Sequence, residues 1–256
     1  MIRVLFNKKG GVGKSSLAVN LAAISAQQGF KTLLLDLDTQ CNSTAYLNIT
    51  STEGPTIADF FRQTVTFHLH RKDPKEFSQP TGVENLDIIA GSEALAELES
   101  ELHSRHKIYK LKEALEKLQE DYERIYIDTA PALNFYSLSA LIGASHCLIP
   151  IDCDDFSRQG LYSLQQQIGE IQEDHNPRLI IEGIIANQYM ANANLPKQII
   201  EELTEEGYPV IPQYIGQSVK MRESHQAKQP LITLAPKHKL TQSILGIYEW
   251  LEKKPA

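Results

Sequence analysis

The sequence predicts an α/β fold in which helices cover both faces of a mostly parallel, twisted sheet. Short runs rich in aliphatic residues alternate with longer stretches of helical period, which is typical of a parallel sheet wrapped by helices. Runs such as TLLLD and CLIPI are apolar at successive positions, as expected of strands that are buried on both faces. A glycine-rich loop, NKKGGVGKSS, follows the first of these runs and precedes the first helical stretch.

The expected elements follow in chain order. Strands are predicted over residues 3–6, 32–35, 86–90, 124–127, 144–150 and 179–185. The first helix is predicted over residues 14–28. Residues 92–120 are charged and helical in period, so we expect them to form a helical pair that packs on the sheet.

The segment from about residue 48 to residue 80 interrupts this alternation. It has mixed charge, His68 and His70, and three prolines, at positions 55, 74 and 80. We interpret it as a surface excursion of a single domain spanning residues 1–256. Within it we expect a helix near residues 56–63 and a surface that faces a partner or a second copy.

Composition narrows the classes of function. A length of 256 residues with 42% hydrophobic content is enough for one well-buried domain. The net charge of −7 argues against a protein that coats nucleic acid with its whole surface, although a local basic patch remains compatible with it. Three cysteines without metal-binding spacing favour a reducing cytosol. No run approaches the roughly 20 apolar residues of a membrane span, and the first apolar run is too short for a secretory signal.

The stretch VLFNKKGGVGKSS places a strand, a glycine loop and a helix start in the order that a phosphate-binding loop requires. Backbone N–H groups would point at the phosphates, with help from the helix N-terminus. Lys14 would reach the β- and γ-phosphates, and the Ser15 hydroxyl would bind Mg²⁺. The candidate nucleotide-binding residues of the loop are Gly10, Gly11, Val12, Gly13, Lys14, Ser15 and Ser16. Lys8 stands where the usual pattern has glycine, and a chance glycine cluster is the competing interpretation.

Acidic residues at two further strand ends supply what a phosphoryl-transfer site needs beyond the loop. In TLLLDLDTQ, Asp36 and Asp38 stand at and just past the end of a buried strand, where open α/β sheets bind their ligands. We expect Asp38 to orient the attacking water and Asp36 to lie near the metal. In RIYIDTAPAL, Asp128 ends another strand and would hold Mg²⁺ through its hydration shell. Each acid alone could be an ordinary strand-end carboxylate.

These three motifs together resemble the ParA/MinD family of P-loop ATPases, and the resemblance covers almost the whole chain. KKGGVGKSS resembles the family's deviant Walker A box, LLLDLDTQCNST its second acidic box and IYIDTAP its Walker B box. Thr39 and Cys41 are mild departures, because the family often has proline and glycine at these positions.

The resemblance implies roles for residues that the motifs alone do not explain. Lys9 occupies the position of the signature lysine, which crosses to the partner subunit and touches its bound ATP. Asn187, at the end of EGIIANQ, would lie near the adenine. The resemblance thus implies a homodimer with two ATP molecules at its interface. For Lys8 we expect no role beyond raising the local positive potential.

The branches of the family differ outside these boxes. The loop begins by residue 9, so we expect no operator-binding domain before it. A MinD-type branch would end in a basic helix that lies on the membrane. Here LTQSILGIYEWLEKKPA contains Glu249 and Glu252, which favours a terminal helix docked on the core. Nitrogenase-like reductases need cluster-binding cysteines, and none follows Asp128 directly.

The remaining ParA-type branch binds DNA without sequence preference near its C-terminal end, and IGQSVKMRESHQAKQPLI resembles that region. Residues 220–239 contain five basic residues and one acidic residue, a net charge of +4 in a chain of −7. Lys220 and Arg222 are the leading candidates for DNA-binding contacts to phosphate, followed by Lys228. A solvated loop with scattered lysines is the competing interpretation.

The resemblance therefore implies a Mg²⁺-dependent ATP hydrolase with weak intrinsic activity. Its ATP-bound homodimer would bind the nucleoid and be released when a ParB-like adaptor stimulates hydrolysis, so we expect a cytoplasmic, nucleoid-associated protein. The cargo could be a plasmid, a chromosome or a large protein complex, and the sequence does not choose among them. The alternatives are a MinD-type positioning ATPase on the membrane surface and a nucleotide-binding scaffold with negligible turnover.

Overall fold

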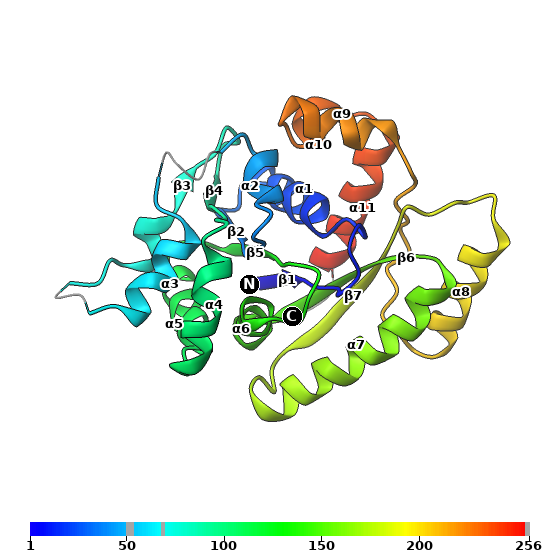
Figure 1. Ribbon diagram of the computed structural model, residues 1–256. Coiled ribbons are helices and arrows are strands. Elements are labelled where there is room, and N and C mark those ends of the chain that lie inside the picture. The colour runs from blue at the N-terminus through cyan, green and yellow to red at the C-terminus, as the bar shows by residue number, and fades with distance from the viewer. Residues whose placement is uncertain (50–53, 68–69, 254–256) are drawn as a thin grey trace.

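A seven-stranded sheet forms the centre of the computed structural model, which describes residues 1–49, 54–67 and 70–253 (Figure 1). The strand order within these residues is β3-β4-β2-β5-β1-β6-β7, and every neighbouring pair is parallel except β3 with β4. The strands are β1 (Ile2–Leu5), β2 (Thr32–Asp36), β3 (Gln79–Pro80), β4 (Leu86–Ile89), β5 (Arg124–Asp128), β6 (His146–Asp152) and β7 (Ile180–Asn187). The predicted α/β fold class is confirmed.

Helices cover both faces of this sheet, and each face has its own hydrophobic core. The helices are α1 (Lys14–Gln27), α2 (Asn42–Tyr46), α3 (Ile57–Val65), α4 (Leu95–Ser104), α5 (Lys110–Leu118), α6 (Phe135–Gly143), α7 (Asp155–Asp174), α8 (Asn194–Glu205), α9 (Val219–Ala227), α10 (Leu231–Leu234) and α11 (Lys239–Lys253), with a 3₁₀ turn, η1 (Pro74–Phe77). Helices α1 and α11 lie on one face, and α6 and α7 lie on the other (Figure 1).

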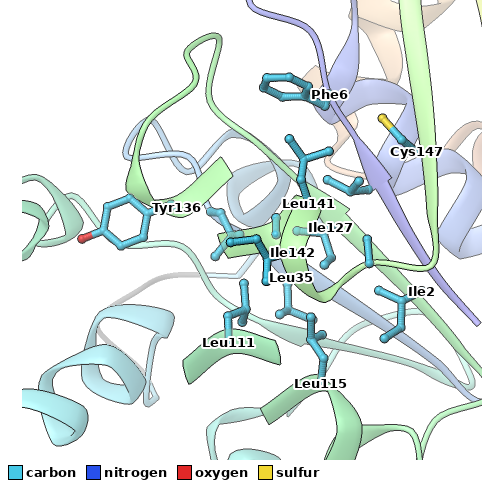
Figure 2. Packing of buried hydrophobic residues seen from close by; sticks show 14 of the residues in the cluster. Ile2, Phe6, Leu35, Leu111, Leu115, Ile127, Tyr136, Leu141, Ile142 and Cys147 are labelled. Carbon is cyan, nitrogen blue, oxygen red and sulfur yellow. The ribbon is translucent and has the colours of Figure 1, made fainter. Parts of the chain in front are cut away.

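Alternate residues of the central strands enter opposite cores, which explains their unbroken apolar runs. In β2, Leu33 and Leu35 face the core that includes α5 and α6, whereas Leu34 faces the core that includes α1. Figure 2 shows Leu35 and Ile127 packed with Leu111 of α5 and Leu141 of α6. Each such side chain contributes about 1.5–3 kcal/mol on burial.

The segment around α3 differs from the predicted surface excursion. A capping box at Thr56 and Asp59 begins α3, and its helical spacing then buries Ile57, Phe60 and Phe61 in the core. Helix α3 therefore packs on the core, because its apolar residues fall on one face and cover the sheet, a contact that the interpretation as a surface excursion did not include. The expected helix near residues 56–63 is present. His68 and residues 50–53 lie outside the described residues.

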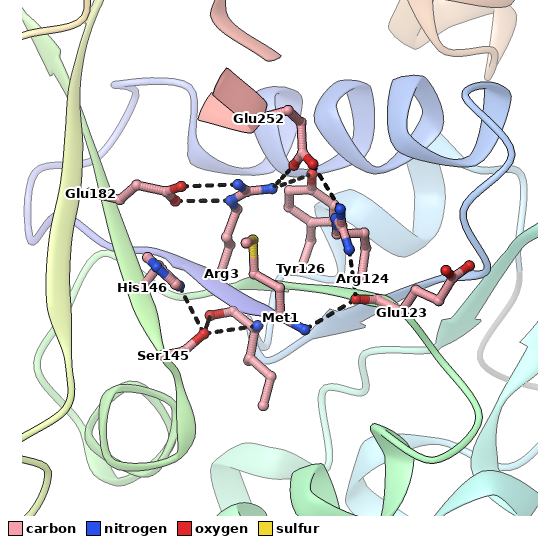
Figure 3. A network of polar contacts seen from close by, with 10 residues as sticks. Met1, Arg3, Glu123, Arg124, Tyr126, Ser145, His146, Glu182 and Glu252 are labelled. Atoms are coloured by element: carbon pink, nitrogen blue, oxygen red, sulfur yellow. Dashed lines mark hydrogen bonds and ion pairs between the residues drawn. The ribbon is translucent and has the colours of Figure 1, made fainter. Parts of the chain in front are cut away.

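A buried polar network joins the C-terminal helix to the sheet (Figure 3). Arg3 of β1 is 1% exposed, and its guanidinium donates to Glu182 of β7 at 2.8 and 2.9 Å and to Glu252 of α11 at 2.7 Å. Arg124 of β5 donates to the other oxygen of Glu252 at 2.7 Å. Ile244, Ile247 and Leu251 of α11 are buried beside α1, so the predicted docking of the terminal helix is confirmed.

Two strands extend further than predicted, and both extensions lead to the edge of the sheet where the parallel strands end. Strand β6 begins at His146 because Ala144 still closes helix α6, and it continues to Asp152. Strand β7 pairs with β6 as far as Asn187. Asp36, Asp128 and Asn187 therefore end their strands at one edge, where ligands bind in open α/β sheets. Among the described helices, none is long and apolar enough to cross a membrane.

Candidate functional site

The glycine loop joins β1 to α1 and has a backbone that only glycine adopts easily. Gly11 and Gly13 have φ of 77° and 92°. A Cβ on Gly13 would lie 2.3 Å from Asn187 Nδ2, so a side chain there would have to displace the Asn187 amide. Asn187 Nδ2 donates to the Val12 carbonyl at 2.8 Å, and Gln188 Nε2 donates to the Gly11 carbonyl at 2.8 Å. The end of β7 is therefore hydrogen-bonded directly to the loop.

Helix α1 starts directly after this loop without a side-chain cap. Its first backbone N–H groups are therefore available to a ligand, and the helix dipole favours a negative one. Lys14 at its first position is only 6% exposed, and its ammonium donates to the Lys9 carbonyl at 3.1 Å. Burial lowers the pKa of Lys14, while Asp128 and Asp38 oppose this shift. A bound phosphate would restore favourable interactions to this partly desolvated cation.

Asp128 lies at the bottom of the site with one oxygen unsatisfied. Its Oδ2 accepts from the Ser43 hydroxyl at 2.7 Å, whereas its buried Oδ1 has no hydrogen-bond partner among the described residues. Burial and the nearby Asp36 raise the pKa of Asp128 to about 7, and the Ser15 and Ser43 hydroxyls act against this rise. A buried, unpaired carboxylate oxygen near the Ser15 hydroxyl is an arrangement that a hydrated cation would satisfy.

Asp36 and Asp38 have different surroundings although they are two residues apart. Both oxygens of Asp36 are occupied, because Asp38 N donates to Oδ1 at 3.1 Å and Thr44 donates to Oδ2 through N and Oγ1 at 2.9 and 2.7 Å. Burial raises the pKa of Asp36 to about 6. Asp38, in contrast, lines a cavity with Lys14. Both oxygens of Asp36 thus have protein donors, and its role near the metal stays a prediction.

Two cavities lie on either side of the glycine loop. The first has a volume of about 510 Å³ and includes Lys14, Ser15, Asp38 and His225 in its lining. The second, of about 420 Å³, lies beside Asn187 and includes the apolar side chains of Ile215, Met221 and Leu240. Gly11, Gly13 and Ser16 line both cavities. Their sizes suit small ligands, and the pair fits a ligand with an anionic end and an apolar end.

The residues fit a magnesium nucleotide better than a metal bound by protein side chains alone. Among the described residues, no three histidine, cysteine, aspartate or glutamate side chains form a metal-binding group. Mg²⁺ differs from metals held in such cages, because it usually keeps several waters and binds through one or two protein groups plus phosphates. Ser15 and Asp128 provide such a limited donor set next to the loop.

Lys9 has its partners within its own chain in this structure. Its ammonium forms ion pairs with Asp152, the last residue of β6, at 2.8 Å and with Asp154, just beyond the strand, at 2.6 Å. The side chain is about one-third exposed. The predicted contact with a second subunit is a separate arrangement that this single chain does not contain.

The candidate DNA-binding residues lie on or beside α9 and have different neighbours. Lys220 pairs with Glu223 on the same helix, and Arg222 lines the second cavity. Lys228, which ends the helix with φ of 52°, donates to Asn48 Oδ1 at 3.1 Å and lines the first cavity. The structure therefore brings Arg222 and Lys228 to the two cavities.

Several residues of the site have no signal in the sequence motifs. His225 of α9 lies 3.0 Å from the Ser16 hydroxyl, as measured from Nε2, and lines the first cavity. Tyr46 of α2 and Pro131 line the same cavity. Because 209 residues separate His225 from Ser16, neither periodicity nor spacing could have joined them.

Comparisons with known proteins agree with this geometry. Residues 1–181 match a family model described as an AAA domain. The chain is 32% identical over 251 residues to the sporulation initiation inhibitor protein Soj of Bacillus subtilis, with 96% of both chains covered. It is 32% identical over 253 residues to the chromosome partitioning protein ParA of Myxococcus xanthus, covering 97% of this chain and 86% of that one.

A solved structure shows the same fold. The ATP complex of a McdA variant from Cyanothece matches with a TM-score of 0.86 at 20% identity, covering 100% of this chain and 97% of that chain. At this identity, the likeness concerns the arrangement of strands and helices.

Proposed function

Because the chain belongs to the ParA/Soj family of partitioning ATPases, we propose that it is a Mg²⁺-dependent ATP hydrolase whose ATP-bound homodimer binds DNA without sequence preference. The observation that carries this proposal is the first cavity, where Lys14 and Ser15 of the glycine loop lie together with Asp38 of the second acidic segment. A phosphate group, its cation and an attacking water need these three kinds of side chain.

Each residue has a role that follows from its surroundings. The free N–H groups of the loop and the buried ammonium of Lys14 bind the phosphates, and the pocket beside Asn187 receives the base. Asp38 accepts a hydrogen bond from Gln40 N at 3.0 Å and faces the cavity, so it can hold the attacking water by its remaining lone pairs. Ser15 and Asp128 would hold Mg²⁺, which neutralises charge on the phosphates.

Slow hydrolysis by the isolated protein is part of the proposal. In the single chain, the ammonium of Lys9 is held by Asp152 and Asp154 instead of pointing at a phosphate. In the ATP-bound homodimer, Lys9 crosses to the ATP of the partner subunit and adds positive charge there. A ParB-like adaptor then stimulates hydrolysis, and the dimer loosens.

DNA binding depends on ATP in this proposal because dimerisation doubles the number of phosphate contacts. The two copies of the basic segment that begins at Lys220 bind one duplex together, and the second contact is effectively intramolecular. The protein is therefore nucleoid-associated in the cytoplasm when it carries ATP. Its cargo is a plasmid, a chromosome or a large protein complex.

Retention of the protein on a random-sequence duplex tests this function. We expect binding with ATP and Mg²⁺ but little binding with ADP or without nucleotide, and a steep loss of binding as salt increases. Lys14→Ala should remove the ATP-dependent binding, because the loop loses its phosphate-binding cation. Lys31→Ala, which changes an exposed lysine at the opposite end of β2, should behave as the parent does. Equal retention in all nucleotide states would contradict the proposal.

A further inference from the structure

Helix α9 touches the nucleotide site through the side chain of His225. Its Nε2 lies 3.0 Å from the Ser16 hydroxyl, near the start of α1. The imidazole also packs edge-on against the Tyr46 ring of α2, with ring centroids 4.4 Å apart and an interplanar angle of 74°. His225 is exposed, and part of its surface faces the first cavity. The ring thus lies where a ligand would meet it.

A second set of contacts, which is buried, attaches the same helix to α1 and α2. The Tyr46 hydroxyl is hydrogen-bonded to the fully buried Ser224 hydroxyl, and Asn20 Nδ2 donates to the Tyr46 hydroxyl at 3.1 Å. Asn20 Oδ1 accepts from Leu231 N at 2.8 Å, at the start of α10. The Tyr46 ring lines the first cavity, but the bonds of its hydroxyl to Ser224 and Asn20 are buried, so we expect them to remain when a nucleotide binds. They form a fixed point about which α9 could shift.

Ser16 is the residue at which a ligand and His225 would compete. It lines both cavities, so a phosphate group between them would lie beside its hydroxyl. A hydroxyl has one proton to donate and forms a stronger hydrogen bond with an anionic phosphate than with a neutral acceptor. Burial lowers the pKa of His225, which favours the neutral imidazole. In the tautomer without a proton on Nε2, this nitrogen accepts from the Ser16 hydroxyl and competes with a phosphate for its proton.

We propose that His225 is a positioning residue that reports nucleotide binding at Ser16 to helix α9. In the nucleotide-free chain, the contact between Ser16 and His225 holds α9 against α1. A phosphate takes the Ser16 hydroxyl, and α9 is then released to move about its buried attachment at Ser224. Lys220 and Arg222 belong to this helix, so the release changes how the candidate DNA contacts are presented. This inference rests on the proposed ATP- and DNA-binding function.

Hydrogen exchange of residues 219–227, with and without ATPγS and Mg²⁺, tests this link directly. In the parent, ATPγS should raise amide exchange in α9 by about fivefold, the effect of losing one hydrogen bond of ordinary strength. His225→Ala should exchange at the higher rate without nucleotide and should not respond to it. His225→Gln places an amide near the position of Nε2 and should restore both the slow exchange and the response.

Gln226→Ala is the matched control, because Gln226 is exposed on the same helix and lines neither cavity. It should keep the slow exchange of the parent and the parent's response. An equal response to ATPγS in the parent and His225→Ala would overturn the inference. So would a parental α9 whose exchange does not change when ATPγS binds.

Calorimetry with ATPγS and retention on the random duplex separate this inference from the proposed function. Because ATPγS must break the contact between His225 and Ser16, we expect His225→Ala to bind ATPγS more tightly than the parent, by up to about fivefold. A loss of more than about tenfold would instead make His225 a direct nucleotide contact and overturn the sensing role. If the parent binds ATPγS but no DNA, the proposed DNA function fails and the exchange result still decides the inference. A parent that does not bind ATPγS would overturn both.

Discussion

Single glycines decide whether the phosphate loop can form. Gly10 and Gly13 are three residues apart in the same loop, yet only Gly13 combines a φ of 92° with a neighbour inside contact distance. A Cβ at Gly10 would meet no atom within 4 Å. The spacing of glycines in the sequence does not reveal this difference, because the difference depends on Asn187 at the end of β7, which is distant in the sequence.

Gly13→Ala should lower the free energy of unfolding by about 1–3 kcal/mol, since the left-handed backbone is strained for alanine and the methyl group displaces Asn187. Gly10→Ala is the matched control and should change it by less than about 0.5 kcal/mol. Urea denaturation of both variants measures the difference. Equal losses in the two variants would show that the contact with Asn187 does not constrain the loop.

Asp36, which ends β2, and Asp38, just beyond it, should also differ in function. Asp38→Ala should reduce ATP hydrolysis by about 100-fold or more while nucleotide affinity stays within a few-fold, because Asp38 faces the cavity and holds water. Phosphate release and calorimetry measure the two quantities. Glu120→Ala, at an exposed residue after α5, is the control. Hydrolysis at the parental rate would remove Asp38 from its proposed role.

Helix α11 owes its position to both apolar packing and charge. Its buried aliphatic residues pack beside α1, while Glu252 receives hydrogen bonds from Arg3 and Arg124. Burial opposes ionisation of Glu252, but the two arginines outweigh it and lower its pKa. Arg3 is almost completely buried, so removing one of its carboxylate partners leaves part of its charge uncompensated.

Glu252→Gln should therefore reduce the free energy of unfolding by about 1–3 kcal/mol at pH 7. A carboxyl with a lowered folded pKa stabilises the fold above its unfolded pKa of about 4.3, and this contribution is lost as the pH falls through the folded value. The gap between the parent and the variant should thus close below about pH 4. Denaturation at several pH values measures it.

Glu249→Gln is the control on the same helix, because Glu249 is exposed. It should leave the free energy of unfolding within about 0.5 kcal/mol of the parent. A gap for Glu252→Gln that does not depend on pH would show that packing, and not ionisation of this carboxyl, holds the helix.

The charge distribution of the chain as a whole favours one region for the proposed DNA binding. The net charge is −7, while residues 220–239 carry +4. Lys220→Glu with Arg222→Glu should weaken binding to every sequence alike. The dependence of log K on log salt should become shallower by about two for each protomer, because each lost phosphate contact removes about 0.9 from the slope.

Arg178→Glu with Lys197→Glu makes the same change in charge at exposed residues outside α9. In the plot of log K against log salt, this control should change the intercept slightly and keep the slope of the parent. Fluorescence anisotropy at a series of salt concentrations gives both values. A parental slope for the α9 variant would place the DNA contacts elsewhere on the protein.

The sequence by itself determined the α/β fold class, the order of most elements, the phosphate loop and the docking of the last helix. These features depend on local patterns, because a run of strand residues, a glycine loop and a helix start are neighbours in the chain. For residues 48–80 the expected helix is present, but the prediction did not include its packing on the core, which the helical spacing of Ile57, Phe60 and Phe61 indicates.

Only the tertiary structure decided which of the predicted site residues share a cavity. It separates Asp38, which faces the cavity, from Asp36, whose oxygens are occupied by Thr44 and Asp38. It also brings His225 to Ser16 across 209 residues. The direction of a side chain and the identity of its partners depend on how distant elements pack together, and no local pattern in the sequence contains that information.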